Sequence, residues 1–202
     1  MVSSNIVEQF LARHGWSGAR KIPLVGDASN RHYVRLKKGC ETALLAQSPA
    51  DDVAAKFILV AEILRKLNFS APVIFAAEPA QGLVLQEDFG DETFSALLDY
   101  GIKAAPLYQL ATDTLIHSHR HFTLSPNLKL FDEQRFLEEA MLFCDYGPGK
   151  TDKSEKRSWF KDAWLDPLSQ AFEIPQSILL RDFHSGNLFR LTDRPATKAC
   201  GL

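Results

Sequence analysis

Short runs of apolar residues, separated by glycine, proline and polar residues, dominate the first part of the chain. Runs of this kind are typical of β-strands. They predict strands at residues 22–25, 33–36, 42–47, 72–77 and 82–87. In residues 4–14 and 50–67, apolar residues recur instead at helical spacing, which predicts two helices. The first part of the chain is therefore predicted to form a small sheet accompanied by helices.

The pattern changes from strands to helices after residue 88. Thr93 is placed to cap a short helix, and Asp132 to cap a later one. Apolar residues at helical spacing also mark residues 107–115 and 159–168. Such a change is expected at a boundary between two lobes. The predicted domains are residues 1–88 and residues 89–202.

Residues 178–191 combine two apolar flanks with a polar loop. The flanks, residues 178–180 and 188–191, predict short strands, and Asp182 and Asn187 lie five residues apart between them. In phosphoryl transfer, an aspartate orients the attacking hydroxyl and receives its proton, while an asparagine on the same loop holds a metal ion on the nucleotide phosphates. The spacing suits that chemistry. The alternative is a polar turn in which both residues only help the chain to reverse.

Composition argues against several other classes of protein. The chain has 202 residues, of which 46% are apolar, enough for a buried core. Its 23 basic and 25 acidic residues are mixed along the chain, so we expect no nucleic-acid partner. Three widely separated cysteines favour the reducing cytoplasm. No apolar run approaches the roughly 20 residues that span a bilayer, so no membrane partner is expected either.

The loop resembles a known catalytic motif. Asp182, His184 and Asn187 match the form H-x-D-x-H-x-x-N of the aminoglycoside phosphotransferase and choline kinase superfamily, although Leu180 replaces its first histidine. The resemblance implies an α+β fold of the protein-kinase-like bilobal type, with an antiparallel-sheet N-lobe and a helical C-lobe. It also implies ATP and Mg2+ as cofactors, Asp182 as catalytic base and Asn187 as metal ligand.

Two segments of the first lobe extend the resemblance. The hairpin around Gly26, Ser29 and Arg31 is similar to that of bacterial N-acetylmuramate and N-acetylglucosamine kinases, where it would contact the phosphates, although an ordinary hairpin turn has the same sequence. Residues 42–47 lack the phosphate-binding lysine of most relatives, as that branch tends to.

Residues 82–90 resemble the family's L-L-E-D-x-G segment, which joins the two lobes. The resemblance implies that backbone groups near Gln86, Glu87 and Asp88 hold the adenine. The alternative is that the two acidic residues merely end an edge strand with charge.

The acceptor is expected to be a small polar molecule with a hydroxyl group. An amino sugar such as N-acetylmuramate is favoured by the resemblance, and an aminoglycoside or choline is the alternative. Candidate acceptor-binding residues are His184, Glu138, Glu139 and Asp145.

The superfamily carries a second metal-binding aspartate a short way beyond the catalytic loop, and residues 188–202 offer none in the expected strand. We therefore expect either a piece of a longer protein or a gene that ends early, with weak or no kinase activity. The alternative function is a catalytically dead remnant that binds a nucleotide or a partner. Apolar surface near residues 160–202 is expected to be exposed and to favour self-association.

Overall fold

The computed structural model describes residues 3–24, 31–48, 51–122, 128–146 and 154–202. The chain forms two compact units, one of Met1–His117 with Asp182–Leu202 and one of Ser118–Arg181. The domain boundary predicted after residue 88 lies inside the first unit, and the division into lobes stays a prediction.

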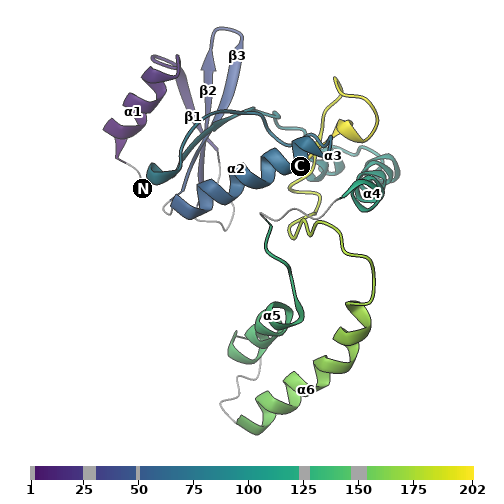
Figure 1. Cartoon of the computed structure of the whole chain (residues 1–202). Helices are drawn as coiled ribbons and strands as arrows, with labels where there is room; N and C mark the ends of the chain where they lie inside the picture. The colour runs from purple at the N-terminus through teal and green to yellow at the C-terminus, as the bar shows by residue number, and fades with distance from the viewer. Residues whose placement is uncertain (1–2, 25–30, 49–50, 123–127, 147–153) are drawn as a thin grey trace. The chain divides into compact units, whose positions relative to one another are not determined.

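Five antiparallel strands make the sheet of the first unit (Figure 1). They are β1 (Arg20–Pro23), β2 (His32–Lys38), β3 (Glu41–Gln47), β4 (Ile74–Glu78) and β5 (Leu83–Gln86). Their order across the sheet is β1-β2-β3-β5-β4. Each predicted strand is present within a few residues. Because β5 lies between β3 and β4, the alternative in which Glu87 and Asp88 end an edge strand is wrong.

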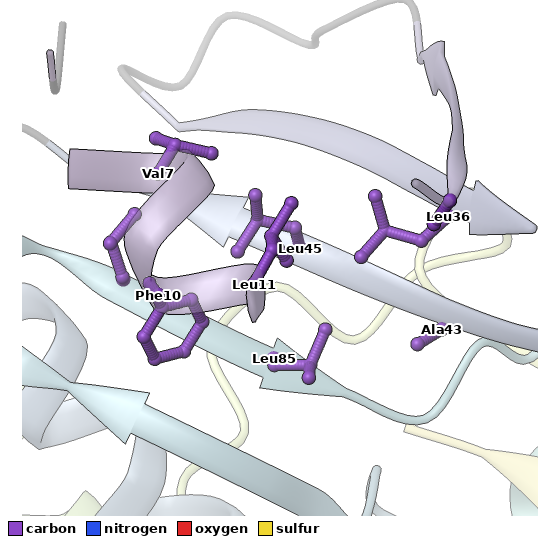
Figure 2. Packing of buried hydrophobic residues seen from close by; sticks show 9 residues of the cluster. Val7, Phe10, Leu11, Leu36, Ala43, Leu45 and Leu85 are labelled. Atoms are coloured by element: carbon purple, nitrogen blue, oxygen red, sulfur yellow. The ribbon is translucent and has the colours of Figure 1, made fainter. Parts of the chain in front are cut away.

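A helix covers each face of this sheet, as alternation of side chains along the strands requires. On one face, α1 (Ser4–Arg13) buries Phe10 and Leu11 against Leu36, Leu45 and Leu85 (Figure 2). On the other face, α2 (Asp51–Lys66) contributes Ala54 and Phe57 to a cluster with Ala46 and Val84. Neighbouring residues of one strand, such as Leu45 and Ala46, therefore enter different cores.

Gly82 allows two strand ends to approach closely. It follows a 3-10 turn at Pro79–Gln81 and has a φ of 67°. A Cβ atom at this position would lie 2.0 Å from the Ser48 carbonyl oxygen, so only glycine fits. The Ser48 N–H donates to the Gly82 carbonyl at 2.8 Å, which joins the end of β3 to the start of β5.

A second core of the first unit lies under the predicted catalytic loop. Here α3 (Phe94–Asp99) and α4 (Ala104–His121) pack with β6 (Phe189–Arg190), a 3-10 turn (Ala196–Ala199) and β7 (Cys200–Gly201). The core is formed by Phe94, Leu97, Leu107, Ala111, Leu188 and Cys200. The strand predicted at residues 178–180 is wrong: these residues form no strand, and 56% of Leu179 is exposed.

The second unit is a pair of helices, α5 (Glu133–Tyr146) and α6 (Ser154–Ala171). Asp132 caps α5, as predicted, by accepting from the Arg135 N–H at 2.9 Å. Phe136, Phe143, Phe160 and Trp164 form ring contacts within this unit. Trp159 and Ile174 are largely exposed, at 71% and 66%. Self-association through such surface stays a prediction. None of the helices described has the length and apolar character needed to cross a membrane.

Candidate active site

The loop at residues 182–187 is a tight polar turn held by its own backbone. The His184 N–H donates to the Asp182 carbonyl at 3.1 Å, and the Asn187 N–H donates to the His184 carbonyl at 2.9 Å. Arg181, immediately before the loop, has a φ of 52°, which is the left-handed region that few side chains adopt. The turn therefore begins with an abrupt change of chain direction.

The two predicted catalytic side chains differ in what they contact. The Asn187 Nδ2 lies 3.1 Å from the Asp182 carbonyl oxygen, so Asn187 is tied to the backbone of Asp182. The Asp182 carboxylate is exposed, and within the described part of the chain it takes part in no hydrogen bond or ion pair. A carboxylate without partners is available to accept a proton from a bound hydroxyl.

The His184 imidazole contacts two other residues of this turn. Its Nδ1 lies 3.2 Å from the Gly186 N–H, and its Nε2 lies 3.1 Å from the Asn187 Nδ2. A neutral imidazole accepts at one nitrogen only, so it accepts from either Gly186 or Asn187 at a time. His184 is exposed. Its predicted role in acceptor binding stays a prediction.

The first turn of α3 anchors the loop. A helix leaves its first N–H groups without intrahelical partners. In α3, the Phe94 N–H donates to the Leu188 carbonyl at 2.8 Å, and the Ser95 N–H donates to the Ser185 carbonyl at 2.9 Å. The Ala96 N–H donates to the Thr93 hydroxyl, the cap that the sequence predicts. The helix N-terminus is thus satisfied partly by its own cap and partly by the loop.

The predicted nucleotide-binding residues lie in different surroundings. Gly26 and Ser29 lie outside the described residues. Arg31 lies over the Phe57 ring of α2, with 5.5 Å from its guanidinium carbon to the ring centre. A small hollow between α2 and the sheet is lined by Arg31, Tyr33, Ala46, Ser48, Val53, Ala54, Phe57, Gly82 and Val84. Gln86 is buried at the end of β5, and its Oε1 has no hydrogen-bond partner among the residues that the structure describes.

The carboxylates of Glu87 and Asp88 are bound by arginines of the same unit. Glu87 forms an ion pair with Arg194 and accepts from the Val73 N–H at 3.1 Å. Asp88 is clamped by Arg35 of β2, at 2.6 Å and 3.0 Å from its two oxygens. The prediction that backbone groups here hold adenine stays a prediction, but these side chains serve the fold.

Sequence reasoning missed Arg35. Its side chain is 10% exposed, and that of Asp88 is 5% exposed. Burial by itself lowers the pKa of Arg35, but hydrogen bonds and charge from Asp88 and Asp91 raise this pKa above its ordinary value. Arg35 therefore stays charged. The sequence did carry one signal. Arg35 lies on the same face of β2 as Tyr33, which packs against the core, and a charged residue on a core-facing side of a strand is unusual unless it is paired.

The three acidic acceptor candidates of the second unit have partners there. The Glu138 carboxylate accepts from Gln134 at 3.0 Å. Glu139 forms an ion pair with Arg181 at 3.0 Å, and Asp145 pairs with Arg157. Their role in acceptor binding stays a prediction.

The described residues offer a magnesium ion few ligands. Among them, no group of three or more histidine, cysteine, aspartate or glutamate side chains is arranged to hold a metal. Magnesium bound to a nucleotide needs only one or two protein oxygens, because phosphates and water supply the rest. Asn187 fits this requirement, because its nitrogen is committed to the turn and its Oδ1 remains as the acceptor.

Comparison with solved structures defines the class of fold. The chain matches the aminoglycoside phosphotransferase APH(2")-IIa, solved as a ternary complex with streptomycin and ATP, with a TM-score of 0.65 and 12% identity over 100% of this chain and 73% of that one. It also matches the spectinomycin phosphotransferase APH(9)-Ia, solved with ADP and spectinomycin, with a TM-score of 0.52 and 11% identity over 99% and 70%. The chain has the protein-kinase-like fold of aminoglycoside phosphotransferases.

Sequence relatives narrow the resemblance. The chain is similar to an N-acetylmuramate/N-acetylglucosamine kinase of Caulobacter vibrioides, with 26% identity over 96% of this chain and 64% of the relative. It is also similar to the kinase of the same name from Pseudomonas aeruginosa, with 30% identity over 96% and 59%. The resemblance predicted from the sequence is confirmed. The chain spans about three fifths of these relatives, and no protein-family model matches it.

Proposed function

We propose that the protein is a small-molecule kinase that transfers the γ-phosphoryl group of ATP to a hydroxyl of a small polar acceptor. Two features of the loop carry this proposal. The Asp182 carboxylate is exposed and has no partner among the described residues, and the Asn187 amide donates to the Asp182 backbone carbonyl. The similarity to named kinases over nearly the whole chain supports the same reaction.

In this mechanism, Asp182 accepts a hydrogen bond from the acceptor hydroxyl and receives its proton as the new O–P bond forms. The bond between the γ-phosphorus and the β–γ bridging oxygen of ATP breaks in the same step, and ADP leaves. The side-chain oxygen of Asn187 would be the group that holds a magnesium ion on the phosphates. A bound magnesium ion would neutralise charge that develops on the phosphate oxygens. The α3 N-terminus keeps the loop in place through Phe94 and Ser95. The protein therefore contributes one general base, Asp182, and the groups that hold the loop in position.

The favoured acceptor is an amino sugar of the N-acetylmuramate or N-acetylglucosamine type, because the named sequence relatives act on these sugars. Aminoglycosides are the alternative that the solved structures suggest, and choline remains a further one. For the 202-residue chain by itself we propose slow turnover. The reason is that neither β6 nor β7, the strands that follow the loop, carries an aspartate that could serve as the second metal ligand.

Radiolabelled ATP with magnesium and each candidate acceptor tests this proposal directly. We expect label transfer to the two N-acetyl sugars in the wild-type protein, and its loss in Asp182→Asn. Transfer to an aminoglycoside alone would correct the acceptor. If the protein binds ATP but transfers label to every acceptor no faster than the buffer control, a nucleotide-binding remnant is favoured. Absence of both binding and transfer would overturn the proposal.

A further inference from the structure

The segment between β5 and α3, residues 87–93, is held on two sides, and we call it the linker. One side faces the nucleotide-binding sheet through β2, and the other faces the catalytic loop through α3 and β6. All of these elements belong to the first unit.

On the sheet side, Arg35 of β2 contacts three residues of the linker, Asp88, Gly90 and Asp91. Arg35 Nε and Nη2 donate to the two oxygens of Asp88, at 2.6 Å and 3.0 Å. Nη2 also donates to the Gly90 carbonyl at 3.0 Å, and Nη1 donates to Asp91 at 2.9 Å. Asp88 in turn accepts from the Gly90 N–H at 3.0 Å. Gly90 has a φ of 81°, so this turn needs glycine.

On the catalytic side, the linker is joined to the strand that follows the loop. The Arg190 N–H donates to the Glu92 carbonyl at 2.9 Å, and the Arg190 side chain pairs with the Glu92 carboxylate at 3.0 Å. Thr93 forms a bridge with Phe189 and caps α3. The next two N–H groups, of Phe94 and Ser95, bind loop carbonyls.

These contacts form one continuous path from the sheet to the loop. Arg35 fixes residues 88–91, and the same backbone continues within a few residues into the amides that hold Ser185 and Leu188. A guanidinium binds a carboxylate through two parallel bonds, so it sets orientation as well as distance. A lysine in its place could balance the charge but could not reproduce the fork.

We propose that Arg35 is a positioning residue, which sets the linker against the sheet and thereby aligns the catalytic loop with the bound nucleotide. The proposal rests on the proposed function for the nucleotide, whereas the path of contacts does not depend on it. Arg35 acts through the linker and touches none of the loop residues in this path.

The test uses the full chain with two variants and one control. Arg35→Lys keeps the charge and removes the fork, and Asp91→Asn removes one arm at an 81% exposed side chain without leaving a buried charge. The control is Arg13→Gln, which breaks another arginine-carboxylate pair, to Glu78 at 2.6 Å, away from the linker. Amide hydrogen exchange is followed at Gly90, Phe94 and Ser95, together with MgATP affinity by calorimetry.

We expect exchange at Phe94 and Ser95 to quicken about tenfold in Arg35→Lys and less in Asp91→Asn, at a temperature where both remain folded. We expect Arg13→Gln to match the wild type. MgATP affinity should fall about fivefold or more in Arg35→Lys. An MgATP affinity in Arg35→Lys equal to that of the wild type would show that the charge alone is sufficient, and would overturn the proposal.

Unchanged exchange at Phe94 and Ser95 in Arg35→Lys, or an equal change in Arg13→Gln, would also overturn it. If the wild type binds no MgATP, the proposed function fails. The exchange result then decides the positioning role by itself.

Discussion

The linker and the loop at residues 182–187 both belong to the first unit, but their acidic side chains have opposite surroundings. In the linker, Glu87 and Asp88 are each bound by an arginine, and Asp88 is nearly buried. In the loop, Asp182 is exposed and has no partner among the described residues. A carboxylate that is fully hydrogen-bonded stabilises a conformation, whereas one without partners remains available for chemistry.

This contrast separates two candidate groups that look alike in the sequence. Both contain an aspartate beside a phenylalanine, as Asp88-Phe89 and Asp182-Phe183. The structure distinguishes them by their surroundings. Loss of the first should affect folding, and loss of the second should affect catalysis.

The largest expected effect is on turnover in Asp182→Asn. Removal of a general base lowers the rate by about 10² to 10⁴. The free energy of unfolding should change by less than about 0.5 kcal/mol, because the side chain is exposed and unpartnered. Steady-state kinetics and urea unfolding measure both, with the exposed Asp193→Asn as control. Equal rates for Asp182→Asn and wild type would contradict the assignment.

The next effect is on stability in Asp88→Ala. Among the described residues, this change leaves the buried Arg35 guanidinium with the exposed Asp91 as its one charged partner. Breaking a buried ion pair from one side costs about 3 to 5 kcal/mol. Urea unfolding provides the measurement. Glu78→Gln, which breaks a more exposed pair with Arg13, should cost less than about 1 kcal/mol. Similar losses in both variants would remove the distinction between the linker and an ordinary surface pair.

Cys200 has a buried thiol in the core under the loop, and its ionisation at high pH should lower the stability of the fold. Burial raises the pKa of this thiol to about 11 from an ordinary 9.0, although a hydrogen bond with Thr114 opposes the shift. The unfolded chain therefore loses this proton first, so the stability that depends on it is present below pH 9 and is lost as pH rises towards 11. The unfolding free energy should fall by about 3 kcal/mol in total once the pH exceeds 11, and by about half of that at pH 10.

Unfolding curves at pH 8, 9 and 10 for Cys200→Ala and wild type isolate this contribution. The exposed Cys40→Ala is the matched control and should follow the wild type. A wild-type pH dependence identical to that of Cys200→Ala would argue against a buried thiol at this position.

The smallest expected effect is on the cap of α3 in Thr93→Ala. The hydroxyl accepts from the Ala96 N–H at 3.1 Å, and its loss should cost about 1 kcal/mol. Serine at this position should restore most of that loss. Thermal unfolding is sufficient to measure it. A loss equal to that of Asp88→Ala would mean that the cap, and not the arginine contact, determines the stability of the linker.

The sequence predicted the sheet well because its information is local. The apolar run in residues 42–47 and the helical spacing in residues 50–67 each depend on neighbours a few positions away. The caps at Thr93 and Asp132 were predicted for the same reason. Local pattern failed at residues 178–180, where an apolar run suggested a buried strand but no strand forms around the exposed Leu179.

The site was predictable only in part. Asp182 and Asn187 stand out by motif, and their spacing is local. The pairing of Arg35 with Asp88 joins residues 53 positions apart, and that of Arg194 with Glu87 joins residues 107 apart. No period or motif encodes such contacts. The motif suggested Glu87 and Asp88 as part of the nucleotide site. These long-range contacts show that their side chains hold the linker in place.

Ser70 and residues 198–202 have a consequence for the order of folding. The Ser70 hydroxyl donates to the Lys198 carbonyl at 2.7 Å, and the Leu202 N–H donates to the Ser70 carbonyl at 2.9 Å. During synthesis, β1 to β5 can pair before residues 198–202 exist, but the contacts of Ser70 with these residues span 128 positions or more. Cys200 of the same segment belongs to the core under the loop. Contacts of such long range form late because loop closure must precede them. A ribosome-bound nascent chain should therefore acquire its sheet well before the core under the loop at residues 182–187 is complete.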